Sequence, residues 1–287
     1  MTATEFEPAR IAANGVDFAY LEAGQGPLVL CLHGFPDTAW SFVPLLGRLA
    51  EAGYRGVSVF MRGYAPSGFA PDGDYSIPAL ARDVIALTEH LGGGQAALVG
   101  HDWGGIAAYA AAAARPDRFS RLLAAGVPHP RRFLHRPSLT QLRRSSYMAA
   151  FQFPVLAERA LARNNFELLD RGIRRASPSW RPDAQILAPI HSNFRDPARI
   201  TAALSYYRAL RRGLFDGRAA QVGPIAIPTR VVYGLQDGAV GAEMFRDQRH
   251  LFTAGVELCP MSGVGHFMHM ERANGFADLV LEFLQAA

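Results

Sequence analysis

The sequence contains no lysine, so all 29 residues counted as lysine or arginine are arginines. Acidic residues number 25, which leaves a formal net charge of only +4 at pH 7. The arginines are scattered among the acidic residues and adjoin one another only in pairs, such as Arg131–Arg132 and Arg211–Arg212. A nucleic-acid-binding surface needs a cluster or stripe of basic residues, so we expect no nucleic-acid partner.

Cysteines and long apolar runs are also scarce. Cys31 and Cys259 are far apart, and neither belongs to a metal-ligand spacing or a disulfide framework. No stretch approaches the ~20 apolar residues that span a bilayer. Residues 1–11 carry Glu5 and Glu7 and lack the apolar segment of a signal peptide. We therefore expect a cytoplasmic protein without a membrane association, a metal ion or an organic cofactor.

Short apolar segments alternate with helical ones in the first part of the chain. The residues at 27–32 (PLVLCL) are continuously apolar, which is typical of a strand buried on both faces of a sheet. The expected strands are 16–22, 27–32, 54–60, 95–99 and 122–127, and the expected helices are 40–52, 77–91 and 104–114. This alternation predicts an α/β fold with a mostly parallel sheet, whose functional groups lie beyond the carboxyl ends of the strands.

The alternation stops between about residues 128 and 220. This stretch is rich in arginine and aromatic residues, is interrupted by several prolines, and contains no clear buried strand. The strand pattern resumes at 229–233 (TRVVY) and 256–259, and 273–284 is amphipathic. An insertion into a two-part core explains this pattern most simply. The predicted parts are a first core segment at 1–129, a helical cap at 130–219 and a second core segment at 220–287.

The strongest local motif is G-H-D-W-G-G at 100–105, which follows an expected strand and begins an expected helix. This is the setting of a nucleophile elbow, G-x-Nuc-x-G, with Asp102 as the nucleophile. The turn is so sharp that side chains at the flanking positions would clash, hence the glycines. The alternative interpretation is an aspartate that caps an ordinary helix.

Two further residues complete a catalytic set. His266 follows Gly265 between the last expected strand and the final helix, where a base is expected, and His269 is the competing candidate. Asp237 directly follows the 229–233 strand and could orient the imidazole, although aspartate is also common in turns. The order Asp102, Asp237, His266 matches the order nucleophile, acid, base in α/β hydrolases.

A backbone oxyanion hole is the next expected part. The segment H-G-F-P at 33–36 follows the first buried strand. In α/β hydrolases this loop and the residue after the nucleophile each supply a backbone N–H group. The two donors would be Phe35 and Trp103, unless H-G-F-P is only a turn closed by proline.

These motifs resemble those of the epoxide hydrolases of the α/β-hydrolase fold, with haloalkane and fluoroacetate dehalogenases as near relatives. The segment R-G-Y-A-P-S at 62–67 is also similar to the family's R-G-Y-G-x-S loop. Two tyrosines of the family's cap have counterparts here. Tyr147 begins one similar segment, and Tyr207 has the matching place in the other. Since adjacent helical residues differ by about 100° in direction, only one of Tyr206 and Tyr207 is expected to face the site.

The resemblance implies the conversion of a small, apolar epoxide to a diol. Asp102 would form an ester with the substrate while the two tyrosines donate to the epoxide oxygen, and His266, held by Asp237, would activate the water that hydrolyses the ester. The implied substrate contacts are His33, Pro36, Trp103, Tyr147 and Tyr207. The oligomeric state stays open.

Two alternatives remain. A dehalogenase would use the same aspartate, but haloalkane enzymes often carry asparagine in place of Phe35, and fluoroacetate enzymes carry arginine in place of Trp103. The other is a catalytically inactive α/β-hydrolase-like binding protein, which would have no use for the complete set of catalytic residues.

Overall fold

The computed structural model describes residues 6–92, 94–135, 137–215 and 222–286. Its centre is an eight-stranded sheet in the order β1-β2-β4-β3-β5-β6-β7-β8. The strands are β1 (Ala9–Ala13), β2 (Val16–Ala23), β3 (Leu28–Leu32), β4 (Arg55–Val59), β5 (Ala96–His101), β6 (Phe119–Ala125), β7 (Thr229–Gly234) and β8 (Val256–Met261). β2 pairs antiparallel with β1 and β4, and all other pairs are parallel. The sheet is therefore mostly parallel, as the sequence predicts.

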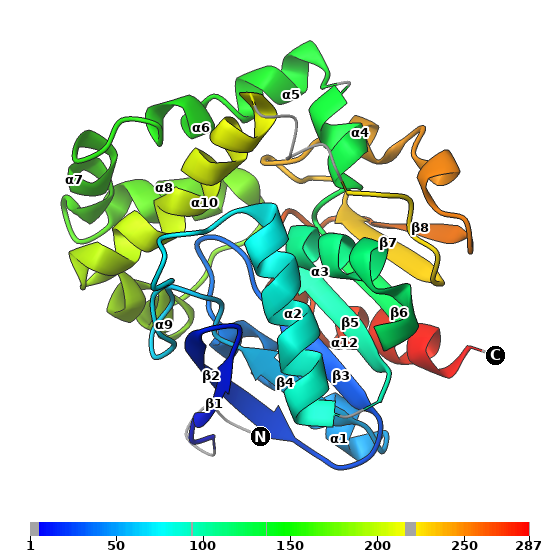
Figure 1. Ribbon diagram of the computed structural model, residues 1–287. Coiled ribbons are helices and arrows are strands. Elements are labelled where there is room, and N and C mark those ends of the chain that lie inside the picture. The colour runs from blue at the N-terminus through cyan, green and yellow to red at the C-terminus, as the bar shows by residue number, and fades with distance from the viewer. Residues whose placement is uncertain (1–5, 93, 136, 216–221, 287) are drawn as a thin grey trace.

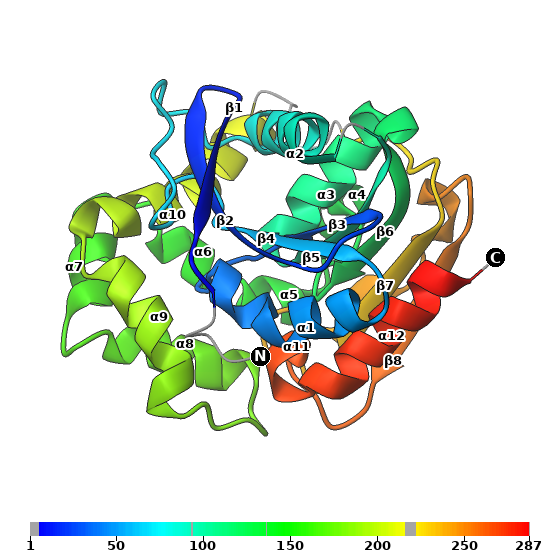
Figure 2. The same cartoon turned by 90° about the horizontal axis from the view of Figure 1, so that it is seen from below.

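Helices cover both faces of this sheet (Figures 1 and 2). α2 and α3 share one apolar cluster on one face, and α1 and α12 share a second cluster on the other. The strands β3 and β5 lie between these two clusters and are buried along their whole length, which explains their continuous apolar sequences. The helices of the core are α1 (Val43–Glu51), α2 (Ile77–Gly92), α3 (Trp103–Ala114), α11 (Met268–Glu271) and α12 (Ala273–Gln285), with single 3-10 turns at Ala39–Phe42, Pro116–Arg118, Ala242–Phe245 and Arg249–Leu251.

Seven further helices lie between β6 and β7 in the described part of the chain, and both views show most of them gathered to one side of the sheet. They are α4 (Pro130–His135), α5 (Leu139–Arg144), α6 (Tyr147–Ala150), α7 (Leu156–Ala162), α8 (Glu167–Ala176), α9 (Ala184–Phe194) and α10 (Pro197–Phe215). The described residues of 126–215 contain no strand. We call this segment the cap; its independence as a domain stays a prediction. None of the helices in the described ranges is long and apolar enough to cross a membrane.

The edge strand β1 is the one strand that the sequence analysis missed. Its residues alternate between half-buried and exposed up to Ala13, and it forms a hairpin with β2 through Asn14 and Gly15, both at positive φ. A short strand with only one residue fully buried has too weak an apolar period to be recognised from sequence.

Candidate active site

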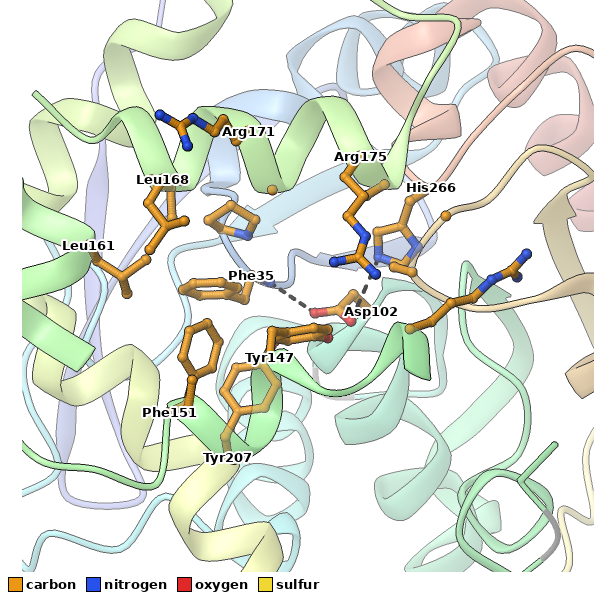
Figure 3. A pocket seen from close by; sticks show the side chains of 18 of the residues that line it. Phe35, Asp102, Tyr147, Phe151, Leu161, Leu168, Arg171, Arg175, Tyr207 and His266 are labelled. Atoms are coloured by element: carbon orange, nitrogen blue, oxygen red, sulfur yellow. Dashed lines mark hydrogen bonds and ion pairs between the residues drawn. The ribbon is translucent and has the colours of Figure 1, made fainter. Parts of the chain in front are cut away.

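Asp102 stands at a sharp turn between β5 and α3, with φ 50° and ψ −118°. Non-glycine residues rarely adopt positive φ, and their occurrence at a strained turn is a frequent feature of functional sites. The flanking glycines make the turn possible. A Cβ atom at Gly100 would lie 2.5 Å from the carbonyl oxygen of Gly104, and one at Gly104 would lie 2.1 Å from the carbonyl oxygen of Leu32. The elbow therefore points the Asp102 carboxylate away from the sheet and into a cavity (Figure 3).

His266 lies between two carboxylates. Its Nδ1 atom is 2.8 Å from Oδ2 of Asp237, and its Nε2 atom is 3.8 Å from Oδ2 of Asp102. Asp237 is itself held in place, because its Oδ1 atom accepts hydrogen bonds from the N–H groups of Ala239 and Val240 at 2.7 and 2.8 Å. Nδ1–H donates to Asp237, so Nε2 is the ring nitrogen that faces Asp102.

The two carboxylates govern the charge of this histidine. Burial opposes the charged form of His266, but the charges of Asp237 and Asp102 outweigh burial and raise its pKa to about 10. Burial likewise works to raise the pKa of Asp102, yet His266 and the Phe35 N–H group hold that pKa below its usual value. At 3.8 Å the His266–Asp102 contact is too long for a hydrogen bond. The free site at neutral pH thus contains an ion pair between imidazolium and carboxylate.

The loop after β3 supplies a hydrogen-bond donor to Asp102. The Phe35 N–H group donates to Oδ1 of Asp102 at 2.9 Å. The approach is close because Gly34 has no side chain; a Cβ atom there would lie 2.4 Å from Cβ of Asp102. Trp103 is the first residue of α3, where backbone N–H groups have no partner within the helix. Both residues predicted to form the oxyanion hole therefore adjoin the nucleophile.

The cap brings two tyrosines to the same place. Tyr147 of α6 and Tyr207 of α10 line the cavity beside Asp102, with ring centroids 6.0 Å apart (Figure 3). Burial, with the Asp102 charge also contributing, raises the pKa of both phenols, so both remain protonated proton donors. Tyr206 points elsewhere: its hydroxyl donates to the Arg62 carbonyl oxygen at 2.8 Å. Of the two adjacent tyrosines, Tyr207 is the one in the site.

The cavity above Asp102 has a volume of about 350 Å³ and is mainly apolar. Its apolar walls include Phe35, Phe151, Leu161, Leu168 and Phe267. A second, smaller cavity of about 50 Å³ shares Asp102, Tyr147 and Tyr207 with the first. The predicted substrate contacts divide between them: Pro36 lines the large cavity and Trp103 the small one.

His33, one of the predicted substrate contacts, lies away from the two cavities at Asp102. It lines neither cavity; it is fully buried, and its Nε2 atom accepts a hydrogen bond from the Met61 N–H group at 3.0 Å. Its Nδ1 atom lies 3.0 Å from the Gly34 carbonyl oxygen. His33 thus joins the loops after β3 and β4 and supports the position of Phe35. Both of its ring nitrogens contact backbone groups, which leaves neither of them for a ligand.

His269, the competing candidate for the base, lies below the elbow. Its Nε2 atom is 3.0 Å from Oδ2 of Asp37, and its ring stacks on Phe42. His101 separates this pair from His266, and the Nε2 atom of His101 lies 3.0 Å from the His266 carbonyl oxygen. Neither His101 nor His269 lines the large or the small cavity at Asp102, and both are buried, so their geometry is that of a support for the loop that carries His266.

The sequence analysis did not anticipate a connection between the cap and the base. Ser177, just after α8, accepts hydrogen bonds from the N–H groups of His266 and Phe267 at 2.9 and 3.1 Å through its Oγ atom. The same hydroxyl donates to Glu271 at 2.6 Å. A serine before a proline carries no recognisable signal for this role, because the contact joins residues almost 90 positions apart.

Comparisons with known proteins identify the family of the chain. The family model for the alpha/beta hydrolase fold matches residues 27–273, and the chain therefore belongs to this family. An AB hydrolase superfamily protein of Bacillus subtilis, YfhM, is 30% identical over 96% of each chain. An epoxide hydrolase of Caballeronia sordidicola is 30% identical over 96% of this chain and 92% of its own. The crystal structure of epoxide hydrolase VrEH1 from Vigna radiata superposes with a TM-score of 0.85 at 26% identity, covering 99% of each chain.

Proposed function

We propose that this protein is an epoxide hydrolase that converts a small, largely apolar epoxide to a vicinal diol. The observation that carries the proposal is a carboxylate nucleophile at the elbow opposite two protonated tyrosines, the half-buried Tyr147 and the buried Tyr207. The relatives named epoxide hydrolases support it. When a nucleophile attacks an sp³ carbon, water must be able to cleave the bond that forms. A carboxylate meets this requirement because its product is an ester.

In the first step, an Asp102 oxygen would attack one ring carbon as the carbon–oxygen bond of the epoxide breaks. The released oxygen needs a proton, which Tyr147 or Tyr207 would donate. The resulting tyrosinate recovers its proton from the His266 imidazolium. Alkylation also removes the negative charge of Asp102, one of the two charges that raise the His266 pKa. The base therefore becomes available only once the ester has formed.

In the second step, neutral His266 would take a proton from water, and the hydroxide would attack the ester carbonyl of Asp102. The N–H groups of Phe35 and Trp103 would stabilise the oxyanion, with a typical value of about 3 to 4 kcal/mol per donor. Collapse releases the diol when the ester oxygen takes a proton from the new carboxyl group. Asp102 returns as a carboxylate and His266 as an imidazolium, so the net reaction is epoxide plus water to diol.

Trapping the ester tests this proposal. In His266→Gln the second step should stall, so intact-protein mass spectrometry after mixing with aryl and alkyl epoxides should show a gain of one whole epoxide, which peptide mapping locates at Asp102. A gain only from haloalkanes, without the halogen, would instead indicate a dehalogenase. No adduct and no turnover with either panel would favour a binding protein.

The tyrosines have a matched control in Tyr206. General-acid catalysis is typically worth about 10² to 10⁴ in rate, and the second tyrosine can replace part of it. We expect Tyr147→Phe and Tyr207→Phe each to slow adduct formation at least about tenfold, whereas Tyr206→Phe removes a hydroxyl bound to backbone and should not. Full activity in both of the first two variants would contradict the assignment.

A further inference from the structure

Three arginines line the main cavity, namely Arg144, Arg171 and Arg175, and the proposed reaction uses none of them. The charge of Arg144 acts on Glu243, which does not line the cavity. Arg175, in the last turn of α8, lines the cavity, and Figure 3 shows its side chain extending towards Asp102 and His266. Arg171 also lines the cavity from one turn earlier, but it points away from Asp102 and pairs with Glu167. In the described ranges, no hydrogen bond or ion pair joins the Arg175 side chain to another residue. Its guanidinium group is thus free to bind a ligand.

The backbone at Arg175 is fixed to both catalytic loops. The Ala176 carbonyl oxygen accepts hydrogen bonds from the N–H groups of Gly238 and His266 at 2.9 and 3.1 Å. A Cβ atom at Gly238 would lie 1.9 Å from the Arg175 carbonyl oxygen, so the chain after Asp237 packs directly on this residue. The Arg175 side chain is exposed to solvent, but its backbone is held in place by the loops that carry the acid and the base.

The charges in the cavity are unbalanced. Among the described residues that line it, Asp102 is the only carboxylic acid, whereas Arg144, Arg171, Arg175 and the His266 imidazolium are cationic. The positive charge of Arg175 lowers the pKa of Tyr147, although burial has the larger, opposite effect. Its field thus reaches the hydroxyl proposed to hold the epoxide oxygen. An anionic substrate group would supply the missing charge, and the planar guanidinium fork matches a carboxylate in particular.

We propose that Arg175 is a specificity-determining residue and that the substrate is an epoxide carrying a carboxylate close to the oxirane ring. The carboxylate would bind Arg175 while the ring lies between Asp102 and the tyrosines, and the apolar remainder would occupy the part of the cavity lined by Phe151 and Leu161. This substrate class rests on the proposed function; the anion-binding role of Arg175 does not.

Kinetics on a matched substrate pair tests the substrate class. The pair is trans-3-phenylglycidate and its primary amide, which differ in charge but hardly in shape. A hydrogen bond to a charged group typically strengthens binding by about 10- to 100-fold. We therefore expect the kcat/KM of wild type to be at least about tenfold higher for the carboxylate than for the amide. Arg175→Gln should abolish this ratio, and Arg175→Lys should retain part of it. Arg174→Gln makes the same change of charge on the same helix, outside the cavity lining, and should retain the full ratio.

Ligand binding without turnover separates the two proposals. Calorimetry with 3-phenylpropanoate and 3-phenylpropanamide should show tighter binding of the anion by wild type and by Arg174→Gln, but not by Arg175→Gln. If this difference appears while no epoxide is turned over, the anion site stands and the epoxide hydrolase function fails. If epoxides are turned over but neither the kinetic ratio nor the difference in binding depends on Arg175, the inference is wrong and the epoxide hydrolase function stands.

Discussion

Two buried histidine–carboxylate pairs lie close together in this protein, and they behave in opposite ways. The His266–Asp237 pair has a nitrogen–oxygen distance of 2.8 Å, and the His269–Asp37 pair one of 3.0 Å. Yet the pKa of His266 is raised to about 10, whereas burial, with the charge of His266, lowers the pKa of His269 to about 3. Contact with one carboxylate does not decide the charge of a buried histidine.

The difference comes from the second carboxylate. His266 faces Asp237 on one side and Asp102 on the other, and together they outweigh the cost of burying its charge. His269 pairs with a single carboxylate of the described residues, that of Asp37, whose own pKa burial raises to about 6, and the nearby His266 repels a further positive charge. The first pair can exchange protons during a reaction, while the second is suited to hold a loop. Four predictions test this contrast, from the largest expected effect to the smallest.

Asp102→Asn removes the nucleophile and one of the two charges beside His266. We expect turnover to fall by at least about 10⁴, the scale seen when a catalytic nucleophile is removed. The pKa of His266 should fall as well, towards the behaviour of His269, because only Asp237 remains. Epoxide turnover and histidine titration by NMR measure the two effects. An unchanged titration would mean that Asp102 does not contribute to the charge of His266.

Asp237→Asn leaves the nucleophile intact but removes the carboxylate that fixes the tautomer of His266. Loss of the orienting carboxylate costs about 10⁴ in a comparable serine hydrolase triad, so we expect ester hydrolysis to slow by about 10³ or more. Alkylation of Asp102 should persist, and mass spectrometry should show the ester accumulating during turnover. Equal slowing of both steps would mean that Asp237 acts in the first step as well as in the second.

Asp37→Asn disrupts the supporting pair. We expect a loss of about 1 to 3 kcal/mol in the free energy of unfolding, the typical cost of leaving a buried partner unsatisfied, and less than about a tenfold change in turnover. Chemical denaturation and steady-state kinetics provide the comparison with Asp237→Asn. A loss of activity as large as that of Asp237→Asn, in a folded protein, would remove the distinction between the two pairs.

The pH dependence of stability should differ in sign between the two histidines. His266 binds its proton more tightly when folded, so its contribution to stability is present below pH about 6.5 and is lost as the pH rises towards about 10. His269 binds its proton less tightly when folded, so its contribution is present above pH about 6.5 and is lost as the pH falls towards about 3. Unfolding of His266→Gln and His269→Gln against wild type across pH 5 to 9 measures both trends. Trends of the same sign would contradict the contrast.

The sequence by itself determined the parts of the protein that depend on neighbours along the chain. Fully buried strands such as β3 and β5 appear as continuous apolar runs, because both of their faces pack against helices. The elbow at Asp102 appears as glycines around an acidic residue, because backbone collisions forbid other side chains there. His266 and Asp237 were recognisable from their places at the ends of strands in a fold of known chain order.

Only the tertiary structure decided the parts that depend on how the cap meets the core. It turned Tyr207 into the cavity and Tyr206 onto a carbonyl oxygen, and it buried His33 between two loops. It also brought Arg175 and Ser177 from the end of α8 to the catalytic loops. Contacts between segments so far apart have no period or spacing in the sequence, because the direction of each side chain follows from the packing of whole helices on the sheet.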